Sequence, residues 1–218
     1  MKLSALFDPQ AQERVRQAVQ TVERQTAAEV VPVVVARSGS YPQAVWRAAT
    51  LGALTGSVLV TLLLRLVDVW GLPWEFWLLA PPLVGAGIGL SATHLSPFLS
   101  RLFLSDEELA VQVRERAEHA FLTEEVFATN QRVGMLIFVS LFERQVVVLG
   151  DRGIASRVPP SRWQQIANAV GQGIRQGRAV EALVEGIYQC AQLLVEAGLA
   201  VQPGDTNELA DRLRLSER

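Results

Sequence analysis

A short turn in the second half of the chain carries the residue types best suited to chemistry. Gly150-Asp151-Arg152-Gly153 follows an apolar, β-branched run, and turns at strand ends are where α/β folds usually present their working groups. Asp151 offers a carboxylate to a metal ion. Arg152, Arg157 and Arg162 follow it, and the arginine guanidinium fork suits phosphate. The sequence therefore predicts a candidate metal- and anion-binding region after this strand.

Simpler interpretations of the same residues stay open. Asp151 also suits a turn in which its side chain bonds its own backbone. Calcium usually takes six to eight oxygen ligands, so a lone carboxylate is a poor site unless Glu143, Asp205, Glu208 or Asp211 comes near it. The arginines could equally form a solvated surface or contact anionic lipid headgroups.

Composition excludes several kinds of site. Cys190 is the single cysteine of the 218 residues, which rules out an internal disulfide and a CxxC-type zinc site. His94 and His119 are the two histidines and lie far apart in the sequence. The formal net charge of −2 leaves no basic footprint, so we expect no nucleic-acid partner.

Two predicted strands position the candidate turn. Val133 to Leu141 is an apolar run whose length suits a central strand, and Gln145 to Leu149 is a second β-branched run. Phe142-Glu143-Arg144 interrupts them. We expect the two runs to fold back on each other as a hairpin closed off by Gly150 to Gly153.

Helices and one further strand flank this hairpin in the sequence. Asp8 and Pro9 predict a helix start, with the helix running to about Gln25, and Glu29 to Ala36 predicts a strand in which Pro32 favours an edge position or a bulge. Three more helices are expected to cover the sheet. They begin at the capping box of Ser105-Asp-Glu-Glu108, at Pro159-Pro160 and at Ala179, and they end near Ala120, Gly177 and Gly198.

Two apolar stretches between these elements predict a transmembrane helical hairpin. Residues 48–67 and 77–95 each reach roughly the 20 residues that span a bilayer. Trp46 at one end, and Trp70 and Trp74 in the connector, are typical of interfacial anchoring. The alternative is a very apolar helical pair buried within a soluble core.

Charge gives the orientation of this hairpin. Arg37 and Arg47 precede the first span and Arg101 follows the second, whereas the connector carries Asp68 and Glu75 with only Arg65 nearby. The positive-inside tendency therefore predicts an integral protein of the inner (cytoplasmic) membrane with both termini cytoplasmic.

Glycines recur at helical spacing within both spans. The pairs Gly52/Gly56 and Gly85/Gly89 would let the two helices approach closely, or could form a homodimer interface. Gly85, Gly87 and Gly89 superficially match a nucleotide-binding loop, but such a loop follows a strand, and this one lies inside a predicted span.

The predicted fold class is α/β, a small sheet flanked by helices and interrupted by the transmembrane hairpin. We expect residues 1–40 and 101–201 to form the two parts of one soluble domain, residues 41–100 the hairpin, and residues 202–218 a polar tail. Both parts must lie on one side of the membrane to pair, and two spans satisfy that requirement.

Several segments, in this order and spacing, resemble the TPM domain family and its membrane-bound bacterial members. They are Glu29–Val35, Gly134–Val139, Gly150–Ile154, Trp163–Ile166, Gly186-Ile187 and Asn207–Leu209. The resemblance implies a compact α/β/α fold and, as in some members, divalent-metal binding and phosphatase activity. It also implies that Asp151 would be the acidic residue carried over to a site for Ca²⁺ or Mg²⁺.

Two functions remain open from the sequence. The first is a membrane-anchored interaction or assembly module, in which the cytoplasmic domain binds a membrane or cytoplasmic protein partner. The second is a divalent-metal-dependent phosphatase that uses Asp151, with Arg152, Arg157 or Arg162 on the phosphate and a metal-bound water as nucleophile. The first function has the better support, because the sequence indicates a membrane anchor but shows no clear catalytic constellation.

Overall fold

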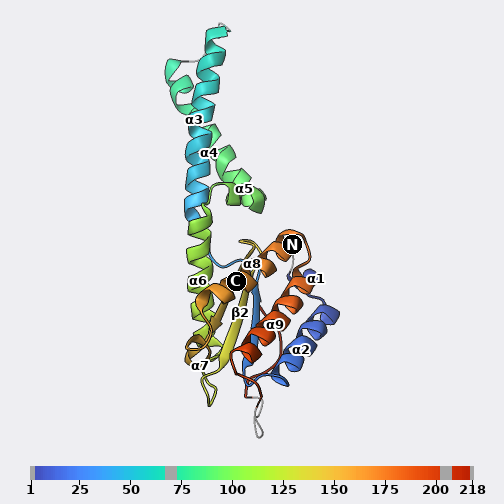
Figure 1. The fold of residues 1–218 in the computed structure, drawn as a ribbon. Helices are drawn as coiled ribbons and strands as arrows, with labels where there is room; N and C mark the ends of the chain where they lie inside the picture. The colour runs from blue at the N-terminus through green and yellow to red at the C-terminus, as the bar shows by residue number, and fades with distance from the viewer. Residues whose placement is uncertain (1–2, 67–72, 202–207, 217–218) are drawn as a thin grey trace. The chain divides into compact units, whose positions relative to one another are not determined.

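The chain forms two compact units. The computed structural model describes residues 3–66, 73–201 and 208–216. Met1–Gly39 together with Ala110–Arg218 make an α/β body, and Ser40–Leu109 make a hairpin unit. The body is thus assembled from two segments that are separated in the sequence by the hairpin unit (Figure 1).

A four-stranded mixed sheet lies at the centre of the body, in the order β3-β2-β1-β4. β1 (Glu29–Val35) pairs in parallel with β2 (Gly134–Ser140), and Glu29 lies opposite Gly134. β2 is antiparallel to β3 (Gln145–Gly150), which confirms the predicted hairpin. The sheet therefore joins the segment before the hairpin unit directly to the segment after it.

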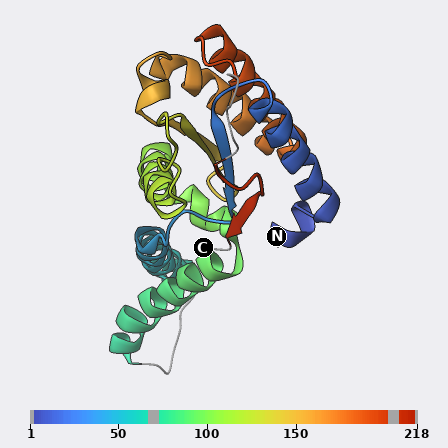
Figure 2. The same ribbon diagram turned by 90° about the horizontal axis from the view of Figure 1, so that it is seen from below.

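Helices cover both faces of the sheet, as the apolar strands predict. Val30 and Val34 of β1 pack in a cluster with α2 (Pro9–Glu23), α8 (Pro160–Arg175) and α9 (Ala179–Glu196). Alternate residues of β1 pack on the opposite face against α6 (Asp106–Thr123). Figure 2 shows α6 on one side of the sheet and α2 on the other. The fold class α/β is confirmed.

Local sequence signals set the helix ends. Asp8 caps α2 by accepting a 2.7 Å hydrogen bond from the Ala11 amide, with Pro9 as the first helical residue. Gly177 and Gly198 follow α8 and α9 with φ of 79° and 77°, a conformation that glycine adopts without strain. Three short helices were not predicted: α1 (Leu3–Leu6), α5 (Pro97–Leu102) and α7 (Arg152–Ala155).

The predicted polar tail over residues 202–218 is wrong at its end. Arg214–Ser216 form β4, which pairs in parallel with Val33–Val35 of β1. Three residues without an apolar run give no strand signal, so this strand depends on its partner rather than on its own sequence. Pro32 lies one residue before the part of β1 that pairs with β4. Among the described residues, β2 is therefore the only strand paired with β1 at Pro32. This local edge is consistent with the predicted edge position, since proline has no N–H to donate.

The hairpin unit contains the two long apolar helices that the sequence predicts. α3 (Pro42–Leu66) begins six residues before the predicted span, and α4 (Trp74–Leu95) follows the connector. Asp68 and Trp70 of the connector lie outside the described residues. Ser100 of the short α5 donates a 2.7 Å hydrogen bond to the Thr93 carbonyl, which fixes the turn after α4.

Glycines allow α3 and α4 to pack closely against each other. A Cβ atom added at Gly52 would lie 2.2 Å from the Gly85 carbonyl oxygen, and one added at Gly89 would lie 2.2 Å from the Ala48 carbonyl oxygen. No side chain fits at such distances, so both glycine pairs serve the close approach predicted for them. A homodimer through the same glycines stays a prediction, and it would have to share faces that are packed within the chain.

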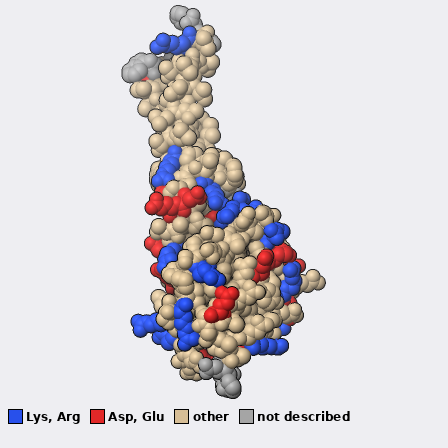
Figure 3. Space-filling view, viewed as in Figure 1, with Lys and Arg blue, Asp and Glu red and all other residues tan. Residues whose placement is uncertain are grey.

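The apolar side chains of this pair are largely exposed. Only 6% of the most apolar window of α3 and 17% of that of α4 is buried. Leu59 and Leu83 are 60% and 71% exposed. Uncharged atoms cover most of the length of α3 and α4 on the face shown in Figure 3. The packing expected of helices buried within a soluble core is therefore absent from the described part of this pair.

Candidate functional site

The turn after β3 places the buried Asp151 in an ion pair with Arg132, whose side chain is about half exposed. Asp151 is 5% exposed, and both of its carboxylate oxygens accept from the guanidinium of Arg132, one of them from Nη2 at 3.0 Å. The Arg152 amide donates to the same carboxylate at 2.7 Å, which makes Asp151 the N-cap of α7. The sequence prediction singled out Asp151 but gave no role to Arg132.

An unusual backbone brings Arg132 into position. Its φ of 57° is left-handed, a conformation that a side chain with a Cβ rarely adopts without support from its surroundings. The support comes from Gly153, whose amide donates to the Arg132 carbonyl at 2.9 Å. A Cβ at Gly153 would lie 2.8 Å from the carbonyl oxygens of Arg132 and Gln131, so the two segments can cross only at a glycine.

These contacts set the charge state of the site. Burial raises the pKa of Asp151, but the hydrogen bonds from Arg132 and from the Arg152 amide outweigh it, and the pKa lies below its usual range. Asp151 is therefore an ionised carboxylate at neutral pH whose oxygens are already engaged.

The three arginines that were predicted to bind an anion have different surroundings. Arg157 donates to the Gly198 carbonyl at 3.1 Å, and Arg162 pairs with Glu196 at 3.2 Å across α8 and α9. Arg152 is exposed beside Asp151. The structure thus keeps Arg152 near Asp151 and engages Arg157 and Arg162 elsewhere.

The carboxylates that could have joined Asp151 divide between the two ends of the sheet. Glu208 bonds Asn130, and its amide donates to Glu29 at 3.1 Å, which puts it at the same end as Asp151. Glu143 is fully buried at the opposite end, where it accepts from the Ser140 hydroxyl and from the Ser38 amide. Asp205 lies outside the described residues.

A second carboxylate group, which the sequence prediction missed, lies at the start of β1. Burial raises the pKa of Glu23 to about 8. A hydrogen bond from the Val30 amide opposes this rise, and the nearby carboxylates of Glu29 and Asp211 add to it. Burial also raises the pKa of Glu29, whose carboxylate accepts from the amides of Glu208 and Leu209. An acidic residue at the head of an otherwise apolar strand was the available signal.

The described acidic side chains do not lie close enough together to form a metal site. In the part of the chain that the structure describes, no three His, Cys, Asp or Glu side chains converge so that they could hold one ion. Glu29 at the start of β1 instead accepts hydrogen bonds from the segment that leads into β4. The Ca²⁺ or Mg²⁺ site at Asp151 stays a prediction.

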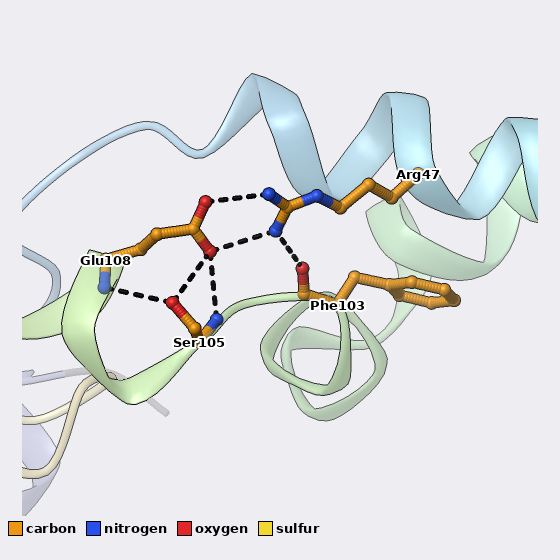
Figure 4. Close-up of polar contacts among 4 residues, drawn as sticks. All are labelled: Arg47, Phe103, Ser105 and Glu108. Atoms are coloured by element: carbon orange, nitrogen blue, oxygen red, sulfur yellow. Dashed lines mark hydrogen bonds and ion pairs between the residues drawn. The ribbon is translucent and has the colours of Figure 1, made fainter.

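A third polar cluster joins the start of α3 to the start of α6 within the hairpin unit (Figure 4). Arg47 bonds both carboxylate oxygens of Glu108, at 2.8 and 2.9 Å, and the Phe103 carbonyl at 2.8 Å. Ser105 and Glu108 exchange hydrogen bonds in the predicted capping box. The hydrogen bonds from Arg47, followed by those from Ser105, lower the pKa of Glu108 to about 2.

Comparisons with known proteins agree with this architecture. Residues 104–193 match the family model of the TPM domain, a segment that runs from before α6 into α9. No curated protein sequence matches the chain. The fold is similar to the NMR structure of the BA42 protein from the psychrophilic bacterium Bizionia argentinensis, with a TM-score of 0.59, 16% sequence identity and 98% of each chain covered.

At that level of identity the second comparison shows the fold alone. β1 falls outside the matched segment, since the hairpin unit separates it from the rest of the body. The matched segment, which contains β2 and β3 of the four-stranded sheet, is therefore similar to the TPM domain.

Proposed function

We propose that this protein is a membrane-anchored interaction module. In this account α3 and α4 span the inner membrane, and the α/β body binds a protein partner at the cytoplasmic face. The observation that carries the proposal is the exposed apolar surface of α3 and α4, of which 6% and 17% is buried in the most apolar windows. Soluble proteins rarely expose contiguous apolar patches beyond a few hundred Å².

The connectivity of the sheet supports the same account. β1 precedes the hairpin unit and β2 follows it, yet the two strands pair over seven residues. A chain that leaves the body, crosses a bilayer and returns to complete the same sheet needs an even number of spans. Two helices of 25 and 22 residues meet that need, since about 20 residues cross the hydrocarbon core.

The contacts of Asp151 favour binding over catalysis. Its carboxylate is committed to Arg132 and to the Arg152 amide, so a metal ion would have to displace an ion pair. The phosphatase stays an alternative prediction, and its direct test is whether Asp151→Asn changes phosphate-ester hydrolysis by the full chain in the presence of Ca²⁺ or Mg²⁺.

The proposal is tested by crosslinking in intact membranes, followed by mild detergent extraction and affinity purification of the full chain. We expect one partner in near-stoichiometric amount. A matched control is Val58→Arg, which puts a charge in the middle of α3 and should prevent anchoring, set against Val58→Ala, which should not. If the partner is absent after crosslinking, or is recovered equally with Val58→Arg, the proposal fails.

A further inference from the structure

The outer edge of β3 is the one long strand edge left open in the described sheet. β3 is the terminal strand, and β2 is its sole strand partner among the described residues. At the other end, β4 is only three residues long. An open edge presents a row of backbone N–H and C=O groups, which natural proteins usually blunt with short strands, charged residues or proline. β3, reading QVVVLG, has none of these devices.

The hydrogen-bond pattern fixes which residues of β3 face outward. The Asp151 amide donates to the Gly134 carbonyl, and the Gly153 amide donates to the Arg132 carbonyl, both at 2.9 Å. Both bonds continue the register in which Met135 lies opposite Gly150.

In an antiparallel ladder, hydrogen-bonded pairs alternate with pairs that are not bonded to each other. Counting back from Asp151, the bonded residues of β3 are Leu149, Val147 and Gln145. The backbone N–H and C=O groups that point away from the sheet are therefore those of Val146, Val148 and Gly150.

A groove runs along this edge. Its volume is about 390 Å³, and every residue of β3 lines it. Ala110 and Arg114 of α6 form one wall, and Trp163 and Ala167 of α8 form the other. An extended peptide laid in the groove would meet the outward backbone groups of β3 along its length, with apolar side chains on both sides.

The charged side chain that lines the groove, and those at both ends of β3 that are exposed, are arginines. Arg144 immediately precedes β3, Arg152 follows it, and Arg114 lies on the α6 wall, all of them exposed. The nearest acidic residues along the strand, Glu143 and Asp151, are buried, and no acidic residue lines the groove. Arg114 also pairs with Glu118, but both side chains are more than half exposed, so that pair can open at little cost.

We infer that this groove binds an extended, acidic segment of the protein partner, which adds to the sheet as a fifth strand beside β3. The inference rests on the proposed function and names the surface and the chemistry of its partner. The backbone groups select an extended chain, and the arginines select negative charge. A second copy of this chain would bring two basic rims together, which opposes pairing of two β3 edges.

The experiment measures fluorescence anisotropy of labelled peptides titrated with the full chain in zwitterionic lipid nanodiscs. One peptide of about ten residues alternates Glu and Val, and its counterpart alternates Lys and Val. We expect saturable binding of the acidic peptide and none of the basic one.

Two variants separate backbone pairing from charge. Val148→Pro removes one outward N–H and should weaken binding about fivefold, since a hydrogen bond contributes about 1 kcal/mol. Arg114→Glu should weaken it about fivefold. Arg16→Glu, the same change on the exposed surface of α2, is the control and should leave binding unchanged. Amide exchange of β2 checks that each variant is folded.

The inference is overturned if the acidic peptide does not bind, if folded Val148→Pro and Arg114→Glu bind it as the native chain does, or if the chain itself dimerises through β3. Its failure is distinguishable from failure of the proposed function. A crosslinked partner that persists with Arg114→Glu would keep the membrane-anchored module and remove this groove as its docking surface.

Discussion

Strands β1 and β2 of the α/β body and the helices of the hairpin unit are both built from largely apolar sequence, yet they differ in how far it is buried. All seven residues of β1 and of β2 are buried. In α3, three residues of 25 are buried, and Leu54, Val58 and Leu62 are each more than half exposed. The two regions differ in what covers them.

This difference shows that an apolar sequence indicates that a segment must be buried, but not what buries it. A strand of seven residues can be enclosed by two layers of helices, as β1 and β2 are. A helix of 25 residues with apolar side chains on all sides cannot be covered by one neighbour, and α4 covers only its glycine face. We propose that lipid covers the remaining surface, and that is the central claim tested below.

The largest expected effect comes from removing a buried side chain of the sheet. Phe138→Ala, at a fully buried residue of β2, should lower the free energy of unfolding by about 3–5 kcal/mol. Leu62→Ala, at a residue of α3 that is 58% exposed, should change it by less than about 0.5 kcal/mol. Urea unfolding of the detergent-solubilised full chain, followed by tertiary circular dichroism, measures both. Equal losses would mean that the two regions are buried alike.

A charge in the hairpin unit should have the next largest effect, and on insertion rather than on the body. Val58→Arg places an arginine near the middle of α3 and should cost about 2.5–3.5 kcal/mol of insertion free energy. The fraction of protein in sealed membranes should fall, whereas Val58→Ala should retain it. An unchanged membrane fraction with Val58→Arg would argue against a spanning α3.

Glu23 makes the stability of the body depend on pH. Its folded pKa of about 8 lies above the ordinary value of 4.5, so the folded state holds the proton more tightly, and stability falls as pH rises from about 4.5 to 8. Glu23→Gln should remove most of this slope and stabilise the chain by roughly 1–3 kcal/mol at pH 8, with little effect at pH 4. Urea unfolding at the two pH values checks it, and equal effects at both would contradict the raised pKa.

Asp151 should make stability depend on pH in the opposite direction and to a smaller extent. Its folded pKa lies below the ordinary 3.8, so its contribution is present above about pH 4 and is lost as pH falls through the folded pKa. Asp151→Asn keeps a capping side chain but loses the pair with Arg132, and it should cost on the order of 1 kcal/mol at neutral pH. The cost should shrink in acid. A cost that is independent of pH would mean that the ion pair contributes nothing.

The sequence predicts the elements whose signals are local. The capping residues Asp8 and Ser105 begin α2 and α6, and the apolar runs of β2 and β3 form the expected hairpin. These signals act within a few residues of where they are read, so no knowledge of the rest of the fold is required.

What the sequence could not predict depends on contacts between distant segments. β4 exists because Arg214–Ser216 meet the end of β1, and Arg132 finds Asp151 only through a left-handed turn that Gly153 permits. The carboxyl group of Glu29 is buried because Glu208 and Leu209 return to it. Of the predicted site residues, Asp151 and Arg152 therefore lie together, but the structure gives Asp151 a partner, Arg132, that no spacing rule indicates.

The most direct test of the central claim is the sidedness of single cysteines in the full chain, with Cys190 replaced by alanine. Glu75→Cys lies at the start of α4, and Gln17→Cys and Asn168→Cys lie on exposed surfaces of the two segments of the body. A membrane-impermeant maleimide added outside intact spheroplasts should label Glu75→Cys alone, and it should label the other two only after permeabilisation. Labelling of all three from one side would contradict a membrane-spanning hairpin.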